Sequence, residues 1–199
     1  MLTDDEWRLL DDLRAGARDG LDDPATRRTL AGAAEKLRVA AVPGGSATGG
    51  GFEVPRRDPC PYCENYAGRY APHGPPAIVV EDDLTVVFLA PAPMGGMPGH
   101  ALVTSRRHAE TLFDVRPEEE AALGAAVAAT ARAIRSALDP AGLLVQQNNG
   151  VAAFQTVAHV HFHVVPKVPG PYPGPEPAQI VPHEERARTA RLLREHWPA

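Results

Sequence analysis

The chain is poor in several residue types, and each shortage narrows what the protein can be. Of 199 residues, only two are cysteines and only 6% are aromatic. The formal net charge is -5, so no global basic field is available to attract a nucleic acid polymer. No uninterrupted apolar run approaches the roughly 18 residues of a membrane helix, and the acidic start lacks the features of a signal peptide. We therefore expect a soluble cytoplasmic protein, with neither a nucleic acid polymer nor a membrane as partner.

The first part of the chain predicts a helical hairpin separate from the rest. A capping box and an apolar stripe predict one helix over 4–18 and a second over 24–40. A stretch rich in Gly and Ser follows, which is typical of flexible linkers. We expect a helical extension over 1–42 and a linker over 43–55.

The main body predicts five strands and one long helix. The helix begins at Pro117, which is followed by three glutamates suited to a first helical turn, and it ends before Asp139. The order β-β-β-α-β-β implies an α+β domain with a mostly antiparallel sheet and a packed helix. A tail rich in Pro and Gly is expected over 169–199, with a final helix at 183–196. The strands are expected at 77–83, 85–91, 100–108, 142–147 and 159–165.

Three histidines stand at alternate positions in the last expected strand: His159, His161 and His163. Side chains of a strand alternate between faces, so these rings should point the same way at steps of roughly 7 Å. Each imidazole on such a face must be hydrogen-bonded, charged or ligated. Three in a row are a poor way to build a core, and they predict a chemical function.

The run "HVHFHVV", residues 159–165, resembles the signature of the histidine triad (HIT) family at every position. Similar stretches precede it, namely Asn148-Asn149-Gly150 and Gln155-Thr156-Val157. The resemblance implies a HIT domain over 56–168 with a five-stranded HIT-like sheet. It also implies a more distant similarity to galactose-1-phosphate uridylyltransferases.

The resemblance implies a reaction at the α-phosphate of a nucleoside 5'-phosphate conjugate. The middle histidine, His161, corresponds to the nucleophile that forms a covalent nucleotidyl-histidine. A neutral imidazole can act in this way if its far nitrogen is held by an acceptor. Relatives are commonly homodimers, so a homodimer is expected here. The resemblance further implies catalytic roles for His163, His100 and Thr156, and substrate binding by Asn148, Gln155, Phe154 and His163.

The two cysteines, Cys60 and Cys63, are spaced C-x-x-C and allow three interpretations: a redox pair, a metal site or two buried thiols. A redox pair belongs at the start of a helix directly after a strand, and no strand is predicted before Cys60. The family resemblance implies a structural zinc held by both cysteines, His108 and His159. Such a Cys₂His₂ set closes a tetrahedral site. His73 is an alternative third ligand.

The sequence departs from the family at two positions. Where relatives carry an Asp that holds the ribose hydroxyls, this chain has Ala90. Where relatives carry a Gly before the Gln, it has Phe154, which either narrows the pocket or stacks on a base, or else faces the core or a dimer seam. The function expected is a nucleotide hydrolase or nucleotidyl transferase. The alternatives are transfer to a sugar phosphate or other acceptor, a catalytically weakened nucleotide-binding protein, and a hydrolase with a metal on the three histidines.

Overall fold

The computed structural model describes residues 26, 52–69, 73–94, 98–168 and 179–198. The chain divides into two compact units, Met1–Gly51 and Phe52–Ala199, and the sheet and the helices that cover it belong to the second unit. Apart from Thr26, the predicted helical extension over 1–42 lies outside the described residues. So does the greater part of the predicted linker.

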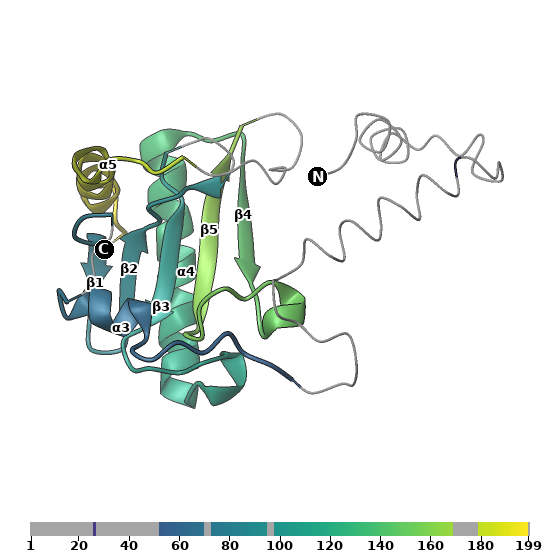
Figure 1. Ribbon diagram of the computed structural model, residues 1–199. Helices are drawn as coiled ribbons and strands as arrows, with labels where there is room; N and C mark the ends of the chain where they lie inside the picture. Colours follow the sequence, from purple (N-terminus) through teal and green to yellow (C-terminus); the bar gives the residue numbers. More distant parts are fainter. Residues whose placement is uncertain (1–25, 27–51, 70–72, 95–97, 169–178, 199) are drawn as a thin grey trace. The chain divides into compact units, whose positions relative to one another are not determined.

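A five-stranded antiparallel sheet forms the centre of this second unit, in the order β1-β2-β3-β5-β4 (Figure 1). Each pair of neighbouring strands is antiparallel, so the α+β prediction is confirmed. In the described parts of the connections, 3₁₀ turns lie at Leu112–Asp114 and Val151–Ala153. The strands are β1 Ala77–Glu81, β2 Thr85–Leu89, β3 Ala101–Ser105, β4 Gly142–Gln147 and β5 His161–Lys167.

The predicted ends of β4 and the predicted starts of β1 and β2 are confirmed, and the remaining strand ends were wrong by a few residues. β5 begins at His161 rather than 159, because the N–H of Val160 donates to the carbonyl of Ala109, beyond the end of β3. β3 ends at Ser105, where the hydroxyl of Ser105 donates to the carbonyl of Arg107 and the chain bends. His159 therefore precedes the strand instead of opening it.

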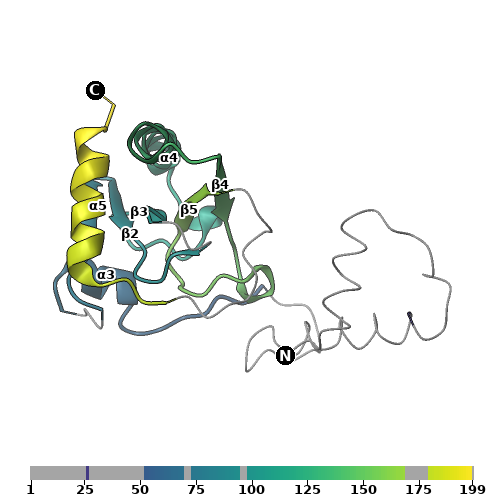
Figure 2. The ribbon, with the colours of Figure 1, turned by 90° about the horizontal axis from the view of Figure 1, so that it is seen from above.

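Helices cover both faces of the sheet, as seen from above in Figure 2. The long helix α4, Pro117–Leu138, and the final helix α5, His183–Glu195, pack on one face. The short helix α3, Pro61–Tyr66, lies on the other face, where Tyr62 and Tyr66 contact β2 and β3 residues. Both faces are covered there, so every residue of β2 is buried.

The alternation along β2 and β3 supplies two hydrophobic cores. Val87 and Val103 face α4 and α5, where they meet Leu123, Ile134 and Leu193. Their neighbours face α3 instead and form a smaller cluster. That cluster consists of Val86, Phe88, Ala90 and Leu102, with Tyr62, Tyr66 and Ile78 packed against it.

The arginines of helix α5 fasten it to the edge strand β1 and to two neighbouring segments. Arg194 donates from Nε to the carbonyl of Val79 and from Nη2 to that of Ile78, both at 2.8 Å. Arg186 donates to the carbonyls of Val181 and His73. The helix predicted at the end of the tail therefore belongs to the same compact unit as the sheet.

By length and composition alone, α4 is long and apolar enough to cross a membrane. The helix nevertheless contains no uninterrupted apolar run of that length, because Arg132 and Arg135 interrupt it. Leu123 and Ile134 of α4 are buried against the sheet. Core helices of globular proteins meet the same criterion, so α4 by itself carries no membrane assignment.

An ion pair anchors the start of α4. The side chain of Glu119 is 4% exposed and accepts hydrogen bonds from Arg107 Nε at 2.8 Å and Nη2 at 2.6 Å. It also accepts from the N–H of Arg116 at the N-cap. The hydrogen bonds from Arg107 hold the pKa of Glu119 down at about 2.

Replacing Glu119 with Gln is expected to lower the free energy of unfolding at pH 7 by about 1–2 kcal/mol, because charge-assisted bonds are lost. The pKa of Glu119 lies below its ordinary value of 4.5, so its stabilisation is present above about pH 4.5 and is lost as pH falls toward 2. Urea unfolding of both proteins at pH 7 and pH 3 measures this, with Glu120→Gln as the exposed control. A difference of equal size at both pH values contradicts the prediction.

Candidate active site and metal cluster

Strand β5 places two histidines on the sheet face that carries α3. His161 lies opposite Thr104 and His163 opposite Leu102 of β3, and their ring centroids are 4.9 Å apart. The ring of Tyr62 on α3 lies 5.7 Å from that of His159 and 5.4 Å from that of His161. Tyr62 thus contacts two histidines of the predicted triad, and the third, His163, lies beside His161.

The protonation of His161 is fixed by a backbone carbonyl. Its Nδ1 lies 2.6 Å from the carbonyl oxygen of His159, which can only accept. Nδ1 therefore carries the hydrogen, and Nε2 holds an unshared electron pair. Burial lowers the pKa of His161, so the ring is neutral at pH 7.

His100 orients His163 through a second hydrogen-bonded chain. The N–H of Met94 donates to Nδ1 of His100 at 3.0 Å, so His100 carries its hydrogen on Nε2. That Nε2–H donates to Nδ1 of His163, also at 3.0 Å, which leaves Nε2–H of His163 as a donor. Burial lowers the pKa of His100 to about 3 and that of His163 to about 4. Both rings are therefore neutral donors at pH 7.

Two predicted substrate-binding amides brace the loop between β4 and β5. Gln155 is 2% exposed. Its Oε1 accepts from the N–H of Gly150, and its Nε2 donates to the carbonyls of Glu110 and Val157. Asn148 donates to the carbonyl of Ala153 and accepts from a neighbouring glutamine. Both donors of Gln155 are thus engaged inside the protein.

Phe154 and Thr156 flank Gln155 and are both exposed. Phe154 is 66% exposed, so its predicted alternative place in the core is wrong. Its backbone adopts the left-handed region, with φ 63° and ψ 26°. For a bulky residue that conformation costs roughly 1–2 kcal/mol, and hydrogen bonds within the loop hold the backbone of Phe154 in it.

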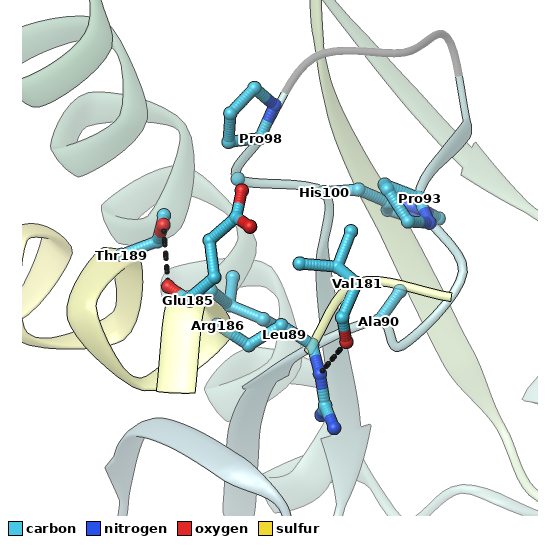
Figure 3. A pocket seen from close by; sticks show the side chains of 10 residues that line it. Leu89, Ala90, Pro93, Pro98, His100, Val181, Glu185, Arg186 and Thr189 are labelled. Carbon is cyan, nitrogen blue, oxygen red and sulfur yellow. Dashed lines mark hydrogen bonds between the residues drawn. The ribbon is translucent and has the colours of Figure 1, made fainter. Parts of the chain in front are cut away.

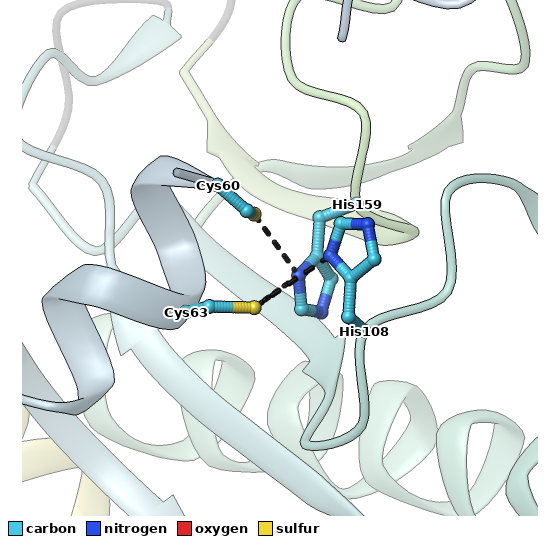
Figure 4. Close-up of side chains that lie close together, drawn as sticks. All are labelled: Cys60, Cys63, His108 and His159. Atoms are coloured by element: carbon cyan, nitrogen blue, oxygen red, sulfur yellow. Dashed lines mark hydrogen bonds between the residues drawn. The ribbon is translucent and has the colours of Figure 1, made fainter. Parts of the chain in front are cut away.

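The two cysteines meet His108 and His159 in one cluster, shown in Figure 4. The four donor atoms lie within 4.8 Å of one another. Nδ1 of His159 is 3.5 Å from Sγ of Cys60 and 3.6 Å from Sγ of Cys63, and Nδ1 of His108 is 3.6 Å from Sγ of Cys63. Zinc bonds of about 2.3 Å to sulfur and 2.05 Å to nitrogen give a tetrahedral edge of about 3.6 Å. The spacing of the donors fits zinc.

The electronic state of the donors fits a cation as well. Nε2 of His159 lies 2.8 Å from the carbonyl of Ser105, so its hydrogen is there and Nδ1 offers its electron pair to the cluster. Burial and the neighbouring Cys60 raise the pKa of Cys63 to about 11. Two adjacent thiolates therefore require a positive partner.

Other ligand sets find less support among the described residues. His73 is not a member of the cluster, and His108 occupies the third position. His161 and His163 are not members either, which speaks against a metal held by the three triad histidines. Cys60 is the N-cap of α3, a helix that the sequence did not predict. Both cysteines are free thiols.

Several residues of the site were not predicted from the sequence. Tyr62 lies between the two cysteines in sequence, and this position could have indicated that it lies near the site. Ser105 orients His159 through its carbonyl. Gln147 and Asn149 exchange hydrogen bonds between their side chains, and Asn149 also accepts from the N–H of Leu112. The sequence singled out neither side-chain pairing, although Asn149 lies in the Asn148-Asn149-Gly150 stretch that resembles the family.

A small pocket adjoins His100 where β2 and β3 approach the start of α5 (Figure 3). Ala90 and His100 line it from the sheet, and Glu185 and Thr189 line it from α5. Glu185 supplies the only carboxylate among the described residues of its lining. The pocket beside Ala90, the position where relatives carry an Asp, thus contains a carboxylate that comes from another element.

Known proteins resemble this chain in sequence and structure. Residues 72–170 match the model of the HIT domain. The HIT-like protein MT1300 of Mycobacterium tuberculosis is 35% identical over 144 residues, which are 69% of this chain and 92% of that protein. A HIT-like protein from Bartonella henselae matches with a TM-score of 0.63 and 28% identity, over 71% of this chain and 98% of its own.

One similar structure is a zinc-bound histidine triad family protein from Mycobacterium smegmatis. It has a TM-score of 0.56 and 32% identity, over 70% of this chain and 93% of its own. The metal of that neighbour and the Cys₂His₂ cluster of this chain together indicate zinc binding.

Two further relatives carry an activity in their names. Adenosine 5'-monophosphoramidase hnt1 of Schizosaccharomyces pombe is 37% identical over 45% of this chain and 62% of its own. Adenylylsulfatase HINT3 of Arabidopsis thaliana is 30% identical over 66% of this chain and 64% of its own. These matches support nucleotide chemistry in general, and the more distant similarity to galactose-1-phosphate uridylyltransferases stays a prediction. On its domain match, its relatives and its fold, the chain belongs to the HIT family.

Proposed function

We propose that this protein is a HIT-type nucleotide hydrolase or nucleotidyl transferase, acting at the α-phosphate of a nucleoside 5'-phosphate conjugate. The observation that carries the proposal is the hydrogen bond from Nδ1 of His161 to the carbonyl of His159. It leaves Nε2 of a neutral imidazole as a nucleophile of fixed direction.

In the proposed reaction, Nε2 of His161 attacks phosphorus and the bond to the leaving group breaks, which gives a covalent nucleotidyl-histidine. Nε2–H of His163, held in line by His100, donates to a phosphate oxygen on which negative charge gathers. Thr156, on the exposed side of the loop, donates to the leaving atom. The leaving group departs with a proton that solvent supplies through the hydroxyl of Thr156. Water or another acceptor then attacks phosphorus and gives up its proton to solvent. The bond from phosphorus to Nε2 breaks, and His161 leaves as the neutral imidazole with its hydrogen still on Nδ1.

The loop amides have a supporting part in this proposal. Asn148 and Gln155 hold the loop that carries Thr156 and Phe154 beside β5. Their engaged side chains favour a positioning role over the direct substrate contact expected from the sequence. Phe154 offers an exposed ring at the same loop for contact with the substrate.

The zinc is proposed as structural. Cys60, Cys63, His108 and His159 would hold it, and its chemistry would be that of a cross-link with four protein ligands and no open position. It would join α3 to the segment after β3 and to the residues just before β5.

The relatives from S. pombe and A. thaliana, named as a monophosphoramidase and an adenylylsulfatase, support hydrolysis of an adenosine 5'-phosphate conjugate. The third triad position is His163, whereas uridylyltransferases end in Gln, and this favours hydrolysis over transfer. We further propose that the protein acts in the cytoplasm as a homodimer, as its sequence and family predict.

Glu185 is the proposed acceptor for the ribose hydroxyls in place of the Asp that Ala90 replaces. It lines the same pocket as Ala90 and His100 (Figure 3). Glu185→Gln is expected to raise KM for a ribonucleotide conjugate about 5–20-fold, with kcat within about twofold, because a charge-assisted contact is worth about 1–2 kcal/mol.

The matched control for this prediction is Glu184→Gln, an exposed neighbour outside the pocket lining. A 2'-deoxy substrate should show a smaller effect of the Glu185 change, because one hydroxyl is absent. Equal KM values for wild type and Glu185→Gln contradict the assignment of this carboxylate.

The function itself is tested by incubating the full chain with adenosine 5'-phosphoramidate and following AMP release. Quenching in base should trap a nucleotidyl-protein adduct, which is stable on a histidine in base and lost in acid. Release of AMP without any adduct contradicts the covalent route, and binding of AMP without turnover favours the weakened nucleotide-binding protein. Immediate loss of turnover in chelator, with folding unchanged, favours a metal-dependent hydrolase.

A further inference from the structure

One residue, His159, belongs to both the metal cluster and the candidate active site. Its ring faces the cysteines through Nδ1, at 3.5 and 3.6 Å from the two sulfurs. Its carbonyl oxygen accepts the hydrogen of Nδ1 of His161 at 2.6 Å. A change at the ring of His159 that also moves its backbone therefore acts on the atom that sets the tautomer of His161.

Helix α3 makes a second connection between the same two places. Cys60 and Cys63 stand three residues apart at its start, so their side chains share one face. Tyr62 lies between them in sequence and packs against the rings of His159, His161 and Phe88. A rearrangement of the cysteines shifts the tyrosine that lies against His161.

The thiols are within reach of each other and of solvent. Cys60 and Cys63 are free and partly exposed, and the adjoining ligand His108 is exposed. Their sulfurs lie within 4.8 Å of each other, as all donors of the cluster do. Closing that gap to a disulfide of about 2.05 Å requires movement within a single helical turn.

We propose that Cys60 and Cys63 are a modification site for hydroperoxides, and that their oxidation to a disulfide expels the metal and misaligns His161. The inference rests on the proposed function only where it concerns catalysis. The redox interpretation of the C-x-x-C pair and the zinc interpretation then describe two states of one site.

The chemistry balances with a hydroperoxide as the two-electron oxidant. One thiolate attacks an oxygen of the hydroperoxide, the O–O bond breaks, and a sulfenic acid forms as hydroxide or alkoxide leaves. The second thiolate attacks that sulfur, the S–O bond breaks, and hydroxide leaves. With hydrogen peroxide the two hydroxides take up two protons and become water. Two cysteines are oxidised, one peroxide is reduced, and Zn²⁺ is released unchanged.

The disulfide removes two of the four ligands of the cluster. Sulfur in a disulfide is a far weaker ligand than a thiolate, so His108 and His159 alone no longer hold the ion. The ring of His159 then keeps only its hydrogen bond to Ser105. The direction and tautomer of His161 become less well defined, and turnover falls.

The test treats the zinc-loaded full chain with hydrogen peroxide. Zinc release is followed with a chromogenic chelator, free thiols are counted, and the disulfide is identified by mass spectrometry. The ¹⁵N NMR signals of His161 report which nitrogen carries hydrogen. We expect one zinc released per disulfide formed, loss of the single Nδ1–H tautomer of His161, and at least a tenfold fall in turnover. Reductant and zinc together should reverse all of these.

The matched variant is Cys63→His, which keeps four ligands and cannot form the disulfide. Compared with its own untreated sample, it should retain zinc, the His161 signal and turnover under peroxide. Peroxide that inactivates the wild type while zinc and both thiols remain overturns the proposal. So does zinc release that leaves the His161 signals unchanged.

Failure of the proposed function is recognised separately from failure of this inference. If the reduced, zinc-loaded protein does not turn over a nucleotide conjugate, the proposed function fails. Zinc release, disulfide formation and the His161 tautomer still test the switch on wild-type protein alone, whether or not the variant folds.

Discussion

Replacement of His161 by Ala is expected to lower the turnover of adenosine 5'-phosphoramidate by at least about 10⁴-fold, because the covalent route loses its nucleophile. No neighbouring ring can take its place. Nδ1 of His163 is occupied by His100, and His159 directs its Nδ1 at the cysteines. The base-stable nucleotidyl-protein adduct should disappear in the same variant.

This prediction separates chemistry from binding. Product AMP should bind His161→Ala within about threefold of the wild-type affinity, since the imidazole is expected to contribute mainly in the transition state. His196→Ala is the matched control, because His196 is exposed at the end of α5 and bonds to Ser136. Turnover in His161→Ala equal to that of wild type and of His196→Ala removes His161 from the mechanism.

The second large effect is expected on stability. Cys60→Ala should abolish stoichiometric zinc and lower the free energy of unfolding by at least about 3 kcal/mol, since metal binding free energy is also folding free energy. For a unit of this size, that is a fall in Tm of about 10 °C. Helix α3 has only six residues, and a helix that short depends on tertiary contacts.

Thermal unfolding with metal analysis on the same samples measures this prediction. Chelator should lower the Tm of wild type toward that of Cys60→Ala and have little effect on the variant. Arg57→Ala, three residues away and exposed, serves as control. If the variant unfolds at the wild-type temperature while lacking zinc, the metal has no structural role.

The grouping of the triad histidines and of the two cysteines could be predicted from the sequence because the spacing within each group is local. Histidines at every second residue predicted rings on one face of a strand. The C-x-x-C spacing predicted two thiols close enough to share one site. The order of strands and the long helix followed from the same kind of short-range pattern. His108 was inferred from family resemblance rather than geometry, and the cluster brings it to the cysteines.

What could not be predicted depends on backbone carbonyls and on partners far apart in the chain. The tautomers of His161 and His163 are set by a carbonyl and by His100. The side-chain amide of Gln155 donates to the carbonyl of Glu110 and accepts from the N–H of Gly150, and no sequence pattern in the loop predicts these bonds. Helix α3 was not predicted, because a helix of six residues is too short to show an apolar periodicity in its sequence.

The guanidinium of Arg194 has a consequence for how the molecule meets copies of itself. It occupies the carbonyls of Ile78 and Val79 on the outer strand of one side of the sheet. Arg194 therefore competes with an incoming peptide chain for these carbonyls, which disfavours extension of the sheet at this edge. Among the described strands, β4 is the other outermost one, and its Val145 is 48% exposed. Addition of a strand from another copy of the chain is therefore favoured at the edge strand β4 over β1.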